Sequence, residues 1–286
     1  NKIIEDLIVL KQKTNKLIYF DTTDSTSSIQ IEVFDYINKY WKMQIFKDKN
    51  NYKKDFYGGR IFTDYLKYNK TIYEKKISLN NVINNEDIIK KISLAWNASF
   101  RKYDFYNSNL NNLFISTSFP KTKYKIYQHK NNRLLNFFNF FETNYSRKTI
   151  GYQRKLIKEI INSSNIRLSK YKYYQTLKNT KFCISPFGWG EVAYRDFESI
   201  VYGNILVKPD MDHLITWPNF YKKNHTYVSF KWDCSDLKEV LYFCENNYKQ
   251  LKNLSVNIQE IYKKYISDYN AGTIFTKRLI QLIKEV

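Results

Sequence analysis

The chain has 286 residues, 43% of them hydrophobic and 18% aromatic, which is enough to bury the core of one large domain or of two ordinary ones. Its 7 glycines and 4 prolines exclude a collagen-like or Gly/Pro-rich disordered protein, and no run of uncharged apolar residues is long enough to span a bilayer. The formal net charge of +20 favours anionic partners, namely nucleotides, nucleic acid, anionic lipid or acidic polysaccharide.

The basic residues are mostly lysine, and the chain is also rich in Asn, Ile and Tyr. AT-rich coding produces the same bias, so the lysine charge alone does not identify a partner. The few arginines are more informative, because a guanidinium binds phosphate through two parallel hydrogen bonds. Cys183, Cys234 and Cys244 show no C-x-x-C spacing, which indicates a reducing compartment without structural zinc or a disulfide framework.

The first half of the chain is predicted to contain strands, helices and one turn, from hydrophobic periodicity and turn residues. In chain order these are a helix-like stretch over 1–13, a strand over 17–20, a half-buried strand with alternating residues 41, 43 and 45, a turn at 57–60, a helix over 85–95 and a strand over 114–117. A Rossmann-like domain that begins with a helix lacks its usual first strand. We therefore expect missing or diverged sequence upstream of the first residue.

Asp21 and Asp24 lie in a polar cluster directly after the first strand. Open α/β sheets bind ligands at this end of their strands. A carboxylate placed there can orient an acceptor hydroxyl and remove its proton as a general base. The same residues suit an Asx turn or a helix N-cap, with Asp24 or Ser25 capping the next segment of the chain. The sequence leaves both interpretations open.

The second half alternates strands with helices, which predicts an α/β fold with parallel sheets covered by helices on both faces. The predicted elements are a strand over 136–141, a polar loop over 143–148, helices over 153–161 and 171–177, strands at 182–184, 205–207 and 227–230, and helices over 236–248, 256–265 and 273–283. The basic segment 121–133 is the expected linker. The expected domains are 1–132 and 133–270, followed by a C-terminal helix over 271–286.

The most informative stretch of the second half reads as a buried strand, a glycine turn and a helix. Gly188 and Gly190 form the turn, and Glu191, Arg195 and Glu198 come next with spacings of four and three residues. Proteins of the α/β class build anion pockets in this way, because backbone N–H groups and the helix N-terminus both face the anion. The same spacing places the three charged residues near one helix face, which also suits a surface Glu–Arg pair.

Five segments carry a resemblance to a known family. They are Ser-Pro-Phe-Gly-Trp-Gly-Glu at 185–191, Tyr-Arg-Asp-Phe-Glu at 194–198, Gly203, Lys-Pro-Asp-Met at 208–211 and Trp-Pro at 217–218. Together they resemble the donor-binding half of a GT-B glycosyltransferase, similar to the group-1-like enzymes of surface-polysaccharide biosynthesis and more loosely to exostosin-type enzymes. The similarity is strongest over 170–235. It is weaker over the first half, at 21–24, 58–60 and 95–97.

The resemblance implies two Rossmann-like domains that face each other across a cleft, with a nucleotide-sugar held mainly by the second. It implies that Glu198 holds the donor ribose hydroxyls, that Gly188 and Gly190 lie beside the diphosphate, and that Arg195 neutralises the departing phosphate without a metal. Glu191 and Glu198 are seven residues apart, one fewer than is common in related retaining families. This puts a catalytic role for Glu191 in doubt, and an acid favoured near a helix N-terminus explains it equally well.

The resemblance also suggests further donor contacts. Arg147 and Arg154 flank the loop and helix after the first strand of the second half, where such proteins often contact diphosphate. Asp210 comes directly after a later strand, and the form Asp210-Met211-Asp212 matches the metal-binding D-x-D of GT-A enzymes. Its context in a GT-B-like half differs, so we expect no metal and no cofactor besides the donor substrate.

Two functions explain these patterns. The first is a cytoplasmic glycosyltransferase that moves a sugar from a nucleotide-sugar to a glycan or lipid-linked acceptor, with peripheral contact to the anionic cytoplasmic face of a membrane. The second is a basic nucleic-acid-binding protein without catalysis. The second explains the charge and the 26 Tyr and 20 Phe residues, but not the strand, glycine turn and helix that carry Arg195 and Glu198.

Overall fold

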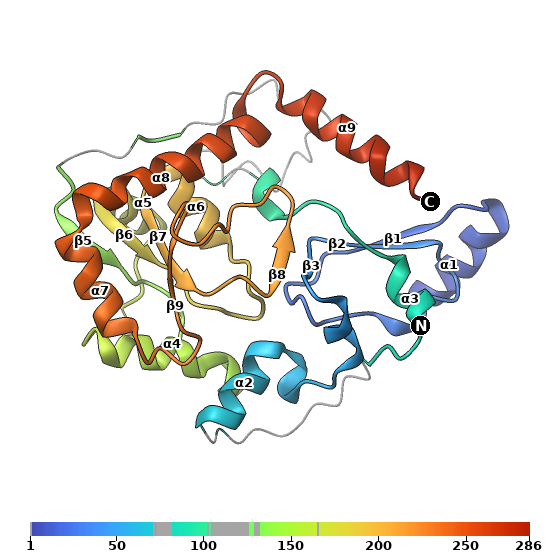
Figure 1. Cartoon of the computed structure of the whole chain (residues 1–286), viewed down its shortest axis with the longest axis horizontal. Coiled ribbons are helices and arrows are strands. Elements are labelled where there is room, and N and C mark those ends of the chain that lie inside the picture. Colours follow the sequence, from blue (N-terminus) through green and yellow to red (C-terminus); the bar gives the residue numbers. More distant parts are fainter. Residues whose placement is uncertain are drawn as a thin grey trace.

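The computed structural model describes residues 2–70, 72, 82–101, 103, 126–128, 132–164 and 166–286. Within them the chain forms two α/β halves, each built on a parallel sheet (Figure 1). One sheet has three strands in the order β1-β2-β4, and the other has four in the order β5-β6-β7-β9. The predicted α/β fold with parallel sheets is confirmed, and the order of the described strands follows the chain in both sheets.

In the first half, short helices lie beside the three-stranded sheet, except that the helix over 61–70 packs its Phe62 into the main apolar cluster of the second half. The core of the first half contains Val33, Phe34, Tyr40 and Phe46, all of them buried. The elements of this half are α1 (Lys2–Lys13), β1 (Ile18–Asp21), β2 (Lys39–Lys42), β3 (Gln44–Phe46), α2 (Ile61–Lys70), α3 (Glu86–Lys91) and β4 (Ile92–Leu94).

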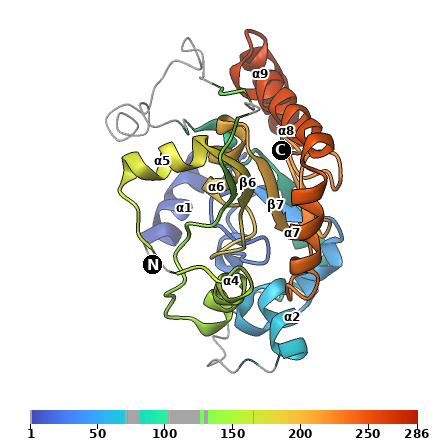
Figure 2. The same ribbon diagram turned by 90° about the vertical axis from the view of Figure 1, so that its left-hand side faces the viewer.

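The second half is larger and contains most of the described helices (Figure 2). Ser169 caps α5, because its side chain accepts the backbone N–H of Lys172. The elements are β5 (Leu135–Phe138), α4 (Lys148–Ile160), α5 (Lys170–Lys178), β6 (Thr180–Ile184), α6 (Tyr194–Tyr202), β7 (Ile205–Pro209), β8 (Leu214–Thr216), β9 (Val228–Phe230), α7 (Leu237–Asn246), α8 (Tyr248–Tyr262) and α9 (Ala271–Lys284).

Helices cover both faces of the second sheet. Successive residues of a strand point to opposite faces, so neighbouring residues of β6 show what covers each face. Phe182 and Ile184 of β6 pack in one apolar cluster with residues of α4 and α7. Cys183, between them, packs in another cluster with residues of α5 and α6. The carboxyl ends of β5, β6 and β7 are therefore the part of the sheet left for loops that hold ligands.

The two halves are joined by a small sheet and by the last helix. Strand β3 of the first half pairs with β8 of the second in an antiparallel arrangement. Helix α9 crosses from the second half toward the first (Figure 1), and its Leu282 packs with Trp41 and Ala95. The described part of the chain contains no helix long and apolar enough to cross a bilayer.

Two predicted elements of the first half differ from the structure. The predicted strand around residues 41–45 is two strands that break at Met43, because β2 pairs with β1 and β4 while β3 turns to pair with β8. The predicted helix over 85–95 begins after Asn85, whose side chain caps it by accepting the N–H of Asp87, but it ends at Lys91. Residues 92–94 instead form β4, because pairing with β2 outweighs local helix propensity.

In the second half, the predicted strand over 136–141 ends at Phe138, and it is an edge strand with exposed residues rather than a buried one. Helices α4 and α8 begin earlier than predicted, at Lys148 and Tyr248. Helix α2 and strand β8 were not predicted. The strand expected over 114–117 and most of the expected linker over 121–133 lie outside the described residues.

Candidate functional site

The loop before α6 does not continue the helix as the charge spacing suggests. Helix α6 begins at Tyr194, because the carboxylate of Asp196 accepts the N–H of Ala193 at 3.0 Å and so caps the helix start. Glu191 therefore precedes the helix, and the prediction that it shares a helix face with Arg195 and Glu198 is wrong. The loop itself is held by buried groups, since Asp196 also binds the Ser185 hydroxyl at 2.5 Å.

Glu191 joins the two halves. Its carboxylate is fully buried, and its Oε2 accepts the backbone N–H of Thr26 at 3.0 Å. The other oxygen, Oε1, lies 3.6 Å from Nε2 of His213. Burial raises the pKa of Glu191, but the nearby His213 and the Thr26 N–H outweigh burial, so the pKa lies below its ordinary value. This favours a structural carboxylate that stays ionised.

The two glycines of the loop permit close approach of other groups. A Cβ added at Gly190 would lie 1.8 Å from the backbone oxygen of Asp24, which no side chain can tolerate. A Cβ added at Gly188 would lie 2.7 Å from Nη2 of Arg154. Gly190 thus lets the loop of the second half meet the loop after β1, and Gly188 makes room for a guanidinium. We refer to the contact region of Asp24, Arg60, Trp189, Gly190 and Glu191 as the junction.

The two predicted bases occupy different environments. Asp21 is buried, and its carboxylate binds Lys42 at 2.6 Å, the Tyr40 hydroxyl at 2.7 Å and the Thr23 N–H at 2.8 Å. Burial raises the pKa of Asp21, but the Lys42 ammonium and these hydrogen bonds outweigh burial and lower it. Both oxygens of the Asp21 carboxylate therefore already accept hydrogen bonds.

Asp24 has an exposed side chain, and its carboxylate accepts no hydrogen bond from the described residues. Partial desolvation raises the pKa of Asp24, opposed by the charge of Arg60 and assisted by that of Glu191. Of the two aspartates, Asp24 is the one that a substrate can reach and that can exchange a proton.

Two arginines form hydrogen bonds between the halves, one within the junction and one outside it. Arg60 donates through Nε to the carbonyl of Trp189 and stacks over its ring, with 5.4 Å between the guanidinium carbon and the ring centre. Arg147 donates through Nη2 to the carbonyl of Gly58 at 2.6 Å. Both contacts cross between the halves. Trp189, the residue before Gly190, is 41% exposed, which leaves part of its ring accessible.

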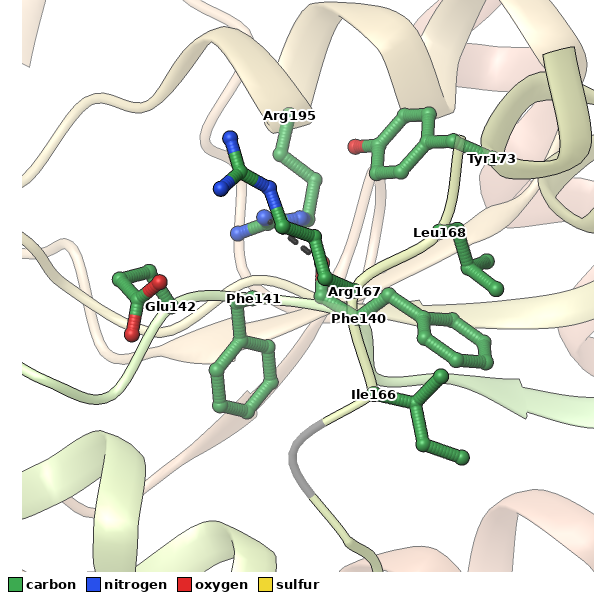
Figure 3. Close-up of a pocket in the computed structure, with 8 residues that line it drawn as sticks. All are labelled: Phe140, Phe141, Glu142, Ile166, Arg167, Leu168, Tyr173 and Arg195. Atoms are coloured by element: carbon green, nitrogen blue, oxygen red, sulfur yellow. Dashed lines mark hydrogen bonds between the residues drawn. The ribbon is translucent and has the colours of Figure 1, made fainter. Parts of the chain in front are cut away.

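A pocket of about 360 Å³ lies at the carboxyl end of β5 (Figure 3). We call it the arginine pocket. Arg195 donates through Nη2 to the carbonyl of Phe140 at 3.0 Å, while its Nε is buried without a partner among the described residues. The exposed Arg167 also lines the pocket, and it makes no hydrogen bond with any described residue. The lining residues are Phe140, Phe141, Glu142, Ile166, Arg167, Leu168, Tyr173 and Arg195.

Glu198 holds one of the lining residues of this pocket in place. Its two carboxylate oxygens accept the hydroxyls of Tyr173 and Tyr174, at 2.6 and 3.1 Å. Tyr173 lines the pocket, so Glu198 fixes the orientation of a lining ring rather than lining the pocket itself. Ribose binding by Glu198 would require these hydroxyls to be displaced or shared.

Positive charge gathers around the ring of Phe141. The charged groups of Arg154, Lys158 and Arg195 lie 5.7, 5.1 and 5.6 Å from its centre. Within the described residues none of the three forms an ion pair with a carboxylate. Burial lowers the pKa of Arg154 to about 10, and the neighbouring Arg195 acts in the same direction. Buried charge without a counter-ion is costly, so this region favours an anion.

Asp210 lies apart from these groups, at the end of β7. Its carboxylate binds Lys223 at 2.7 Å and the N–H of Asp212 at 2.8 Å. No group of three or more His, Cys, Asp or Glu residues in the described ranges is placed to hold a metal ion. The structure thus divides the predicted residues among the junction, the arginine pocket and this separate turn.

Of the residues that line the arginine pocket, the sequence predicted only Arg195 as a site residue. Arg167 carried one signal, because arginine is rare in this chain, but no spacing linked it to Arg195. Tyr173 is one of many tyrosines and carried none. No family model and no curated protein matches this chain.

The buried carboxylates predict how stability depends on pH. The pKa values of Asp21 and Glu191 lie below their ordinary 3.8 and 4.5, so the folded chain binds these protons less tightly than the unfolded chain. Their contribution to stability is complete above the unfolded pKa values and is lost as the pH falls through the folded ones. We expect urea midpoints to fall steeply below about pH 4.

An Asp21→Asn variant should be less stable near pH 7 and show a shallower loss in acid. The exposed Asp87, which pairs with Lys90 on the surface, provides the control, and Asp87→Asn should change neither quantity measurably. Equal pH dependence in wild type and Asp21→Asn would show that Asp21 is not held ionised by Lys42.

Proposed function

We propose that this chain is a nucleotide-sugar-dependent glycosyltransferase whose two α/β halves act as the two sides of a GT-B enzyme. The observation that carries the proposal is the arginine pocket, with its guanidinium groups and aromatic rings at the carboxyl end of a parallel sheet. The donor nucleotide occupies this pocket. The acceptor, a glycan or lipid-linked glycan, approaches at the junction.

The lining of the pocket matches the parts of a nucleotide diphosphate. Arg167 and the free groups of Arg195 suit phosphate oxygens, because a guanidinium donates hydrogen bonds in pairs. The rings of Phe140, Phe141 and Tyr173 offer faces for a base. The volume of about 360 Å³ lies in the range of small-molecule sites, and the carboxyl ends of parallel strands are where open α/β sheets bind ligands.

Positive charge in the pocket supports departure of the nucleotide. When the bond between the sugar and the diphosphate breaks, negative charge grows on the leaving phosphate. Arg195 is fixed by its bond to Phe140, and Arg154 lies nearby beside Phe141, so this charge meets preorganised cations. Such groups stabilise the transition state without first reorganising.

A continuous set of contacts leads from the pocket to the junction. Arg154 stacks on Tyr145 at 5.1 Å, and Tyr145 contacts Trp189 with ring centres 5.9 Å apart. Trp189 in turn stacks with Arg60, whose charge acts on Asp24. The exposed Trp189 ring is placed to pack against the sugar, and Asp24 is the base that accepts the proton of the acceptor hydroxyl.

Removing one guanidinium at a time tests the donor pocket. Arg167→Met and Arg195→Met should each weaken nucleotide-sugar binding about tenfold or more, because each loses charge-assisted hydrogen bonds to phosphate. Isothermal titration against UDP-, GDP-, CMP- and dTDP-sugars measures this. Lys249→Met removes one exposed charge on α8 and serves as the control for net charge. Donor affinity that is equal in wild type and all three variants would refute the pocket.

Asp24→Asn tests the proposed base. The variant should keep donor affinity while the rate of transfer falls about 100-fold or more, the usual range for loss of a general base. Steady-state kcat and donor KM, measured with the donor that binds best, separate the two effects. The acidic limb of the wild-type pH profile should lie above the ordinary pKa of Asp, 3.8, because the pKa of Asp24 is raised. A wild-type kcat in Asp24→Asn would exclude it as the base.

A further inference from the structure

A second pocket, of about 620 Å³, lies alongside the end of α4. Every residue that lines it has a polar side chain; two are lysines, and Glu159 carries the sole carboxylate. Glu159 is exposed and forms no ion pair with either lysine among the described residues. The lining residues are Thr143, Lys155, Lys158, Glu159, Asn162, Ser163 and Ser164. We call this the lysine pocket.

Lys158 is the unusual member of this pocket. Its side chain is 5% exposed, yet its ammonium has no carboxylate partner in the described part of the chain. It donates to the carbonyl of Ser164 at 3.1 Å and reaches the Ser163 hydroxyl at 3.5 Å, the limit for a hydrogen bond. Burial and the charge of Arg195 both lower the pKa of Lys158. Two neutral partners compensate a buried ammonium poorly.

The chain after α4 is folded back to build the pocket. Asn162 has a φ of 48°, a left-handed conformation that asparagine tolerates better than most residues. This turn lets the N–H of Ser163 bond to the carbonyl of Lys158 at 3.0 Å. The serines therefore lie over the lysine. The pocket therefore combines the buried ammonium of Lys158, the exposed ammonium of Lys155 and several hydroxyl groups.

We propose that the lysine pocket binds a second anionic group, a phosphate or a carboxylate, separate from the donor. Phe141 lines the arginine pocket, and its ring lies close both to Arg195 of that pocket and to Lys158 of the lysine pocket. In the reaction proposed above, the group belongs to an acidic acceptor glycan, and this assignment rests on the proposed function. The proposal that the lysine pocket binds an anion does not rest on the proposed function.

The test uses inorganic phosphate and glucuronate as probes, with glucose as the neutral control, titrated by calorimetry at constant ionic strength. The starting protein is Arg167→Met, in which the arginine pocket is weakened. Adding Lys158→Met should weaken binding of the anions about tenfold or more, and adding the exposed Lys155→Met should weaken it by a smaller factor. Adding Lys249→Met should change nothing. The probe that binds more tightly identifies the group as phosphate or carboxylate.

A further variant keeps the test decisive if Lys158→Met does not fold. Ser164 is exposed, so Ser164→Glu places a carboxylate at the pocket without disturbing the core and should abolish binding of both anions. Unchanged binding in Lys155→Met and Ser164→Glu, or equal loss in Lys249→Met, would overturn the proposal. Nucleotide-sugar affinity in otherwise wild-type Lys155→Met should stay unchanged, so failure of the lysine pocket is distinguishable from failure of the donor pocket.

Discussion

The two halves meet where the backbone at Gly190 passes against the carbonyl oxygen of Asp24, and the rest of the site depends on that contact. A Cβ at Gly190 would collide with this oxygen, and the next residue, Glu191, fixes the approach through the N–H of Thr26. The same contact brings Asp24 against the residue that follows the exposed Trp189. One glycine and one buried carboxylate thus determine how a predicted base faces the other half of the protein.

Electrostatics distinguishes two kinds of charged group in this chain. Buried pairs such as Asp21 with Lys42 and Asp196 with Lys208 are compensated, and they hold strands and loops in place. Arg154, Lys158 and Arg195 around Phe141 donate to backbone carbonyls and form no ion pair with a carboxylate among the described residues. The structural charges have an opposite charge beside them, whereas the cations that we propose bind an anion have no carboxylate partner among the described residues. The uneven pairing, more than the net charge, points to the binding region.

The sequence was sufficient for the α/β class, because the alternation of apolar strands with helices is a local pattern. The pairing of β3 with β8 could not be predicted, since it joins two three-residue strands that are distant in the chain. The start of α6 was misplaced because Asp196, rather than Glu191, caps it, and spacing alone does not say which acid does so.

The candidate site was predictable in part for the same reason. Arg195 was singled out by its neighbours in sequence, but its partner Arg167 is brought to the pocket only by tertiary structure. The difference between Asp21 and Asp24 likewise depends on Lys42, which lies on the next strand. Short motifs therefore identified the residue types and the end of the sheet where the site lies. Which partner each side chain binds could be seen only in the folded structure.

The central claim is that the arginine pocket recognises a nucleotide diphosphate. Thermal unfolding of the wild-type chain with nucleotide-sugars, with the matching uncharged nucleosides and with single-stranded oligonucleotides tests it most directly, because a ligand that binds the folded state raises the unfolding midpoint by mass action. We predict a concentration-dependent rise with one nucleotide-sugar, no rise with its nucleoside, and loss of the rise in Arg195→Met. Stabilisation by oligonucleotides that salt abolishes, with no response to any nucleotide-sugar, would contradict the claim and indicate a nucleic-acid-binding protein.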